Sequence, residues 1–190
     1  KDKKYLDRLY TEIENTASYP SWQPSSFLSV AEMSLGYAIA YDWNYYDWTD
    51  GQRKFILDTL LDKGLTYGVD IYNGIKHGGT SFISATHNWN LVCNASLMIS
   101  GIAIADEYPD IADLLLDRGA NSIQKGLTPY NPLGGYPEGA MYWAYGTNFL
   151  TYIMASLDTA FEDGFNFPGK YKLYEAPGIS KTPEFPIYMA

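Results

Sequence analysis

The chain has 190 residues, of which 46% are hydrophobic, and a formal net charge of −9. This hydrophobic content excludes an intrinsically disordered protein. The acidic balance argues against a nucleic acid as partner, because phosphate binding needs a basic surface. No apolar run approaches the ~18 residues that a membrane-spanning helix needs, so no membrane span is expected.

Aromatic residues are the main compositional signal, with 18 Tyr, 8 Phe and 5 Trp. They fit either a tyrosine-rich core and surface or a carbohydrate groove in which flat rings stack on sugars. Trp22, Trp43 and Trp48 are expected to pack in the interior rather than to form sugar platforms. The single cysteine, Cys93, excludes an internal disulfide, and we expect it to be buried.

Helical periodicity dominates the first third of the chain. Tyr5, Leu9 and Ile13 lie one turn apart and predict a helix over residues 3–17. An apolar stripe predicts a second helix over residues 25–41. Thr49 and Gln52 are spaced as a capping box, which predicts a third helix that ends near Tyr67. An aromatic loop, residues 42–48, is expected between these last two helices.

The rest of the chain continues the helical pattern. Residues 68–86 carry four glycines and are expected to form a long connection, which in a compact domain is often functional. Helices are predicted over residues 87–107, 109–125 and 137–162, with Pro109 and Pro137 at first helical positions.

The predicted fold class is therefore all-α, with three helical hairpins and no convincing strand. Successive hairpins favour an incomplete (α/α) toroid, in which each pair packs on its neighbours. We expect residues 1–166 to form this helical-hairpin domain. Residues 167–190 are expected to be an irregular, proline-rich segment, and the chain is expected to be a fragment of a larger multidomain protein.

The predicted helix at residue 87 begins with polar residues. Thr86 suits the N-cap position, so His87 and Asn88 fall in the first turn beside free backbone N–H groups. Asn90 and Asn94 follow His87 at helical spacing and form a polar stripe on a helix that is otherwise apolar. Each residue alone fits a structural cap, but the polar stripe and the helix N-terminus together favour a binding site for a carboxylate.

A second candidate cluster lies at the start of the last predicted helix. Glu138, Tyr142, Tyr145 and Phe149 are spaced by four, three and four residues, which places them on one helical face. Pro137 at the first helical position puts the Glu138 carboxylate at the positive end of the helix dipole. A carboxylate one turn ahead of two phenols is an unusual arrangement for packing alone.

These two clusters resemble the helical domain of the heparinase II/III-like polysaccharide lyases, a group that includes several alginate lyases. The resemblance spans residues 49–190 and is specific in two motifs. The first motif is HNWNLVCN at residues 87–94, and the second comprises GYPEG at residues 135–139 and YWAYGT at residues 142–147.

The resemblance implies β-elimination from a uronic-acid-containing polysaccharide, either a glycosaminoglycan or alginate. The C5 proton is acidic enough to remove only when the neighbouring carboxylate is neutralised, a task suited to Asn or His side chains. A base then takes that proton and an acid protonates the leaving oxygen, which suits Tyr or His. The resemblance makes Tyr142 the catalytic tyrosine, and gives His87 and Asn88 the role of carboxylate neutralisation or base.

The remaining site residues take binding roles under the same resemblance. Asn90, Asn94 and Tyr145 are expected to contact the substrate, and Glu138 either contacts it or orients Tyr142. Family members complete the cleft with C-terminal β-sandwich domains, which often carry a structural metal. We expect no cofactor or metal in this chain, because His77 alone is not a metal site. The resemblance also implies a periplasmic or secreted bacterial protein whose signal peptide is absent from this chain.

Two other functions remain open at this point. A glycoside hydrolase on a similar toroid would need two carboxylic acids flanking the scissile bond, and Glu138 is the only acid in a convincing position. A non-catalytic carbohydrate-binding helical domain would explain why only half of an active site is visible in the sequence.

Overall fold

The computed structural model describes residues 2–78, 80–161 and 172–189 of the chain, and in these residues it contains helices and no strand. The all-α fold class is thus confirmed. None of the helices in this part of the chain combines the length and apolar character required to cross a bilayer. The longer helices are α1 (Lys3–Ala17), α2 (Leu28–Trp43), α3 (Asp50–Leu60), α4 (Thr66–Tyr72), α5 (Asn88–Ala103), α6 (Pro109–Leu127) and α7 (Ala140–Ala160).

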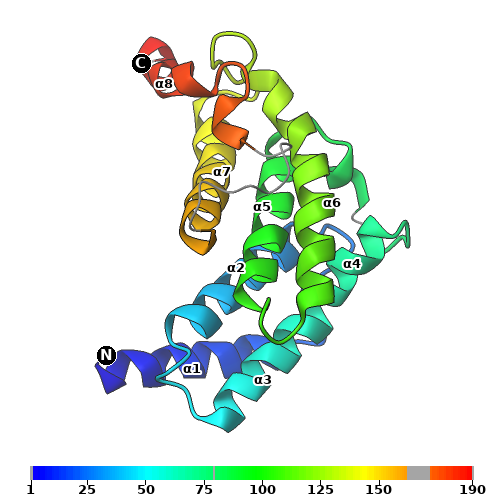
Figure 1. The fold of residues 1–190 in the computed structure, drawn as a ribbon, viewed down its shortest axis with the longest axis vertical. Helices are drawn as coiled ribbons and strands as arrows, with labels where there is room; N and C mark the ends of the chain where they lie inside the picture. The colour runs from blue at the N-terminus through cyan, green and yellow to red at the C-terminus, as the bar shows by residue number, and fades with distance from the viewer. Residues whose placement is uncertain (1, 79, 162–171, 190) are drawn as a thin grey trace.

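Three helices, α2, α5 and α7, run in the same direction, with α5 between the other two (Figure 1). Near their starts, Tyr145 of α7 is hydrogen-bonded to Glu32 of α2. Gly146 of α7 lies against Asn88 of α5. Near their ends, the same three helices line a common pocket. We call these helices the inner helices.

The helix that precedes each inner helix runs antiparallel to it. In the first hairpin, Tyr37 of α2 donates a hydrogen bond to the carbonyl of Ile13 near the end of α1. In the second, Tyr72 at the end of α4 reaches Asn94 of α5. The helix α6 packs antiparallel to α5, and α7 follows α6 in the opposite direction and also packs on α5 (Figure 1).

The core is built around α5, in which 13 of 16 residues are buried. Burying a helix on all sides requires an apolar surface all round, and the sequence of α5 supplies this apart from its asparagines and serines. Cys93 is buried in the core, as expected. Trp22 and Trp48 are also buried, whereas Trp43 is 70% exposed, so the expectation of an interior position was wrong for this tryptophan.

Several helices begin or end at other residues than the apolar pattern predicts, because the local backbone conformation sets the boundary. The helix α2 begins three residues later than predicted, because Phe27 adopts a left-handed conformation with φ 62°. It also extends to Trp43, into the expected aromatic loop. The capping box of Thr49 and Gln52 is confirmed at the start of α3. The predicted end at Tyr67 was wrong, because a π-helical turn (Leu61–Leu65) joins α3 to α4, which ends at Tyr72.

Gly68, expected to open a long connection, lies inside α4. A Cβ atom at this position would lie 2.6 Å from Cδ2 of Leu97 on α5. The glycine is therefore a close-contact residue between two helices rather than a helix breaker. The connection to α5 shortens accordingly and contains a 3-10 helix (Thr80–Ile83).

The C-terminal segment is more regular than expected. It contains two 3-10 helices (Leu173–Glu175 and Ile179–Glu184) and the short helix α8 (Phe185–Met189). Its Thr182 side chain donates to the carbonyl of Gly134 and accepts from the indole of Trp143. The predicted domain boundary at residue 166 lies outside the described residues.

Candidate functional site

The motif residues lie at the end of the molecule where the three inner helices begin. Tyr145 Oη donates a 2.6 Å hydrogen bond to Glu32 Oε1 and so connects α7 to α2. The pKa of Tyr145 is raised by burial and by this bond to a carboxylate. Glu32 was not predicted as a site residue. Its signal in the sequence is that it is the one charged residue among positions 28–41.

The start of α5 differs from the prediction in its cap. The N-cap residue is His87 rather than Thr86, and its side chain makes no capping bond. The Glu138 carboxylate provides the cap instead: it accepts the backbone N–H of Asn88 at 2.8 Å and the Asn88 amide at 2.9 and 3.0 Å. A carboxylate does therefore sit at this helix N-terminus, as the helix dipole favours, but it belongs to the protein itself.

Glu138 reaches this position because α7 starts later than predicted. Gly139 is the N-cap with φ 83°, a conformation that favours glycine, and the helix begins at Ala140. Pro137 and Glu138 therefore lie in the preceding loop, which contradicts the predicted helical positions of both residues. The predicted shared face is retained only by Tyr142, Tyr145 and Phe149, whereas the Glu138 side chain turns toward α5.

Asn88 is 2% exposed, and its Oδ1 atom has no hydrogen-bond partner among the described residues. The Tyr136 ring is buried nearby, and its pKa is raised by burial, by Tyr130 and by the Glu138 carboxylate. Tyr130 donates to or accepts from Thr147 on α7 at 2.8 Å. The floor of the site is thus a packed layer of phenols and amides beneath the first turn of α5.

Tyr142 and His87 are the exposed members of the motif. Tyr142 is 45% exposed at the start of α7. It lies one turn before Gly146, where an added Cβ atom would lie 3.4 Å from Cβ of Asn88. His87 is exposed at the start of α5, with its ring centroid 6.2 Å from that of Trp89. The fold therefore brings Tyr142 and the His87–Asn88 pair to the same end of the molecule.

Asn90 and Asn94 point into the protein rather than toward this end. The Asn90 amide donates to the carbonyls of Phe82 and Ser122, and its oxygen accepts the N–H of Gly126. Asn94 donates to the Asn90 carbonyl at 2.6 Å and accepts from Tyr72. Both side chains are buried, and these bonds join α5 to its neighbours. In this conformation neither asparagine is available for the substrate contact expected of it.

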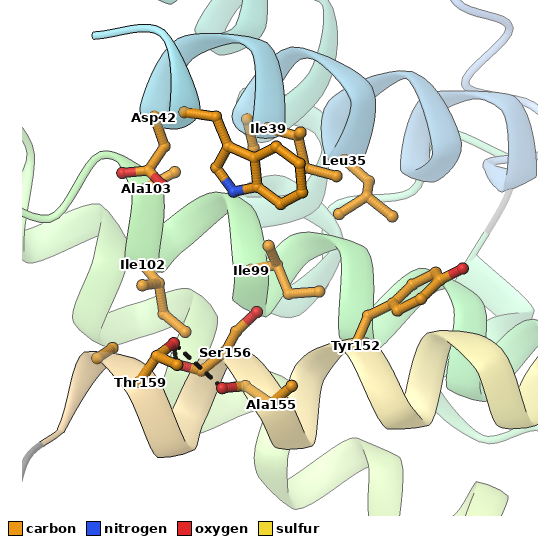
Figure 2. A pocket seen from close by; sticks show the side chains of 13 residues that line it. Leu35, Ile39, Asp42, Ile99, Ile102, Ala103, Tyr152, Ala155, Ser156 and Thr159 are labelled. Carbon is orange, nitrogen blue, oxygen red and sulfur yellow. Dashed lines mark hydrogen bonds between the residues drawn. The ribbon is translucent and has the colours of Figure 1, made fainter. Parts of the chain in front are cut away.

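A pocket of about 590 Å³ lies at the opposite end of the inner helices (Figure 2). Figure 2 shows apolar side chains from α2 and α5 facing Tyr152 and Thr159 of α7. Its lining residues include Leu35, Ile39, Trp43, Ile99, Ile102 and Tyr152. None of them was predicted as a site residue.

The other histidine, His77, contacts residues of α4. His77 Nε2 lies 2.7 Å from Asp70 Oδ2, and its ring packs edge-on against Tyr67. This pair ties the loop after α4 back onto that helix. No group of three His, Cys, Asp or Glu side chains in the described chain is arranged to hold a metal ion.

No protein-family model matches the sequence, and no curated protein matches it. The resemblance to heparinase II/III-like lyases therefore depends on the motif residues alone.

Proposed function

We propose that the protein is a polysaccharide lyase that cleaves a uronic-acid-containing polysaccharide by β-elimination. The observation that carries the proposal is the position of Tyr142. Its exposed ring stands one turn from the contact between Gly146 and Asn88, at the end of the molecule where His87 is also exposed. A tyrosine and a histidine, the residue types that the reaction requires, therefore lie at the starts of two neighbouring helices, at one accessible end of the molecule.

The reaction needs three operations at this end. The uronate carboxylate must be neutralised, a task that suits the positive N-terminus of α5, where a carboxylate already binds. A base takes the C5 proton as the C4–O4 bond breaks, and the leaving oxygen receives a proton from an acid. Tyr142 and His87 are assigned these two proton transfers, because both side chains are exposed.

Asn88 and Glu138 have supporting roles in this proposal. Their three hydrogen bonds hold the first turn of α5 beside the loop that leads into α7. Glu138 also occupies a place that a substrate carboxylate would otherwise take. The substrate carboxylate is therefore assigned to the outer side of the turn, next to His87.

The architecture proposed for this enzyme is an incomplete (α/α) toroid. The shared direction of α2, α5 and α7, and the antiparallel packing of α6 on α5, support this proposal. β-Sandwich domains of the full-length gene product are proposed to complete the cleft. The proposed location is the periplasm or the outside of a bacterial cell.

The test is an ultraviolet assay for the unsaturated product, with the full-length gene product as enzyme. Heparan sulfate, chondroitin sulfate, hyaluronan and alginate serve as substrates, and wild type is compared with Tyr142→Phe. Tyr5→Phe is the matched control, because Tyr5 is exposed on the outer helix α1. Loss of product with Tyr142→Phe alone supports the proposal. Absence of product from every polymer, or full activity of Tyr142→Phe, would refute it.

A glycoside hydrolase is the second candidate, because the fold brings a second carboxylate, Glu32, to the same end as Glu138. Hydrolysis releases reducing ends without ultraviolet absorbance. In that case Glu32→Gln and Glu138→Gln would each abolish release of reducing ends, and Tyr142→Phe would leave it largely intact.

A further inference from the structure

Glu32 of α2 is connected to α7 by a hydrogen bond from Tyr145. The side chain is exposed, and only its Oε1 atom is engaged, by Tyr145. Cys93 of the intervening helix α5 is close by, since Glu32 contributes to the raised pKa of this buried thiol. In the described chain, the second carboxylate oxygen of Glu32 has no hydrogen-bond partner and is available to a ligand.

The rings next to this carboxylate form a continuous series along α7. The Tyr145 ring centroid lies 5.4 Å from that of Phe149, with the rings edge to face. The Phe149 centroid lies 5.9 Å from that of Tyr152, which is 49% exposed and lines the pocket at the far end. A carboxylate beside partly exposed aromatic rings is a combination that can accept hydrogen bonds from sugar hydroxyl groups while the rings pack on sugar C–H groups.

The charge at this end is unbalanced. Glu32 and Glu138 are both acidic, and no lysine or arginine of the described chain is paired with either carboxylate. The partner of Glu138 is the neutral Asn88, and the partner of Glu32 is the neutral Tyr145. A sulfate or carboxylate group placed beside Glu32 would meet a like charge that no ion pair in the described chain neutralises.

We propose that Glu32 is a specificity-determining residue that selects an uncharged sugar in the position next to the uronate. This inference rests on the proposed function and adds the substrate class, a polymer in which uronate alternates with an unsulfated, uncharged sugar. Glu32 accepts hydroxyl protons from that sugar and repels a sulfate or a second uronate in its place.

The test compares unsulfated chondroitin with chondroitin sulfate, because these polymers differ only in sulfate on the uncharged sugar. Both kcat/KM for elimination and the binding affinity are measured for the full-length gene product. The variants are Glu32→Gln, which removes the charge and keeps the shape, and Tyr145→Phe, which removes the bond and keeps the charge. Asp113→Asn on α6 is the control for net charge, since Asp113 is also exposed and lies on an outer helix.

Wild type is expected to prefer the unsulfated polymer, and Glu32→Gln is expected to reduce this preference about tenfold, the effect of removing one like charge near the surface. Tyr145→Phe and Asp113→Asn should retain the preference. Equal use of the two polymers by wild type, or an unchanged ratio in Glu32→Gln, would overturn the inference even if elimination occurs. Selective binding without elimination would refute the lyase proposal and leave the selectivity of Glu32 supported.

Discussion

Replacement of Glu138 by alanine tests the finding that this carboxylate caps α5. The change removes the acceptor of two donors, the backbone N–H and the side-chain amide of Asn88. Asn88 is buried, so water does not easily replace the lost partner. Because α5 is the helix on which the rest of the core packs, weakening its first turn is expected to lower the stability of the whole fold.

The expected cost follows from these contacts. Hydrogen bonds to a charged group contribute roughly 1.5–3 kcal/mol each, and loss of a helix cap costs about 1 kcal/mol. Partial rehydration of the freed groups reduces the sum, which gives a loss of about 3 kcal/mol for Glu138→Ala. For a chain of this size, that corresponds to a decrease in Tm of about 6–12 °C. Glu138→Gln keeps one acceptor oxygen and should cost about half as much.

The assay is urea and thermal unfolding followed by circular dichroism, with Glu184→Ala as the control, because Glu184 is exposed in the C-terminal segment. A double-mutant cycle with Asn88→Ala isolates the interaction between the two side chains. A decrease in Tm below about 2 °C for Glu138→Ala, or no coupling with Asn88, would refute the capping role. In that case the carboxylate would have to be free for another function.

Three further predictions concern buried contacts. Burial raises the pKa of Tyr130 to about 12 from 10. The stabilisation from the protonated Tyr130 phenol is therefore complete below pH 10, and about 2 kcal/mol of it is lost by pH 12. Urea unfolding at both pH values should show a smaller loss in Tyr130→Phe. Gly178→Ala places a Cβ atom against the Tyr130 carbonyl oxygen at a φ of 89°, so residues 172–189 should detach and become sensitive to limited proteolysis. Tyr72→Phe removes the donor to buried Asn94 Oδ1 and should cost about 1–2 kcal/mol in urea unfolding.

The sequence predicted the fold class and most of the helices, because amphipathic periodicity and caps are local properties. The helix over residues 3–17 and the start at Pro109 agree with the structure. Two of the errors fall on glycines. Gly68 fits inside a helix because Leu97 occupies the space that a Cβ atom would take. Gly139 moves the start of α7 to Ala140 because it adopts a positive φ. Neither effect is visible in hydrophobic periodicity.

The candidate site was only partly accessible to sequence analysis, for a similar reason. The motif pattern identified the ends of α5 and α7 that the fold brings together. It did not indicate that the Asn90 side chain would form buried hydrogen bonds and so point away from the site. Glu32 was missed because it lies in α2, outside both motifs, and only the packing of α2 beside α5 brings it to Tyr145.

The shared direction of the inner helices has an electrostatic consequence. Parallel helix dipoles placed side by side repel each other, and each carries about half a positive charge at its start. The helix α6, which packs antiparallel to α5, opposes this repulsion at the central helix. The remaining field at the common starting end comes from backbone N–H groups, which do not titrate. The start of α5 therefore attracts an anion, the Glu138 carboxylate that binds there, without using a single lysine.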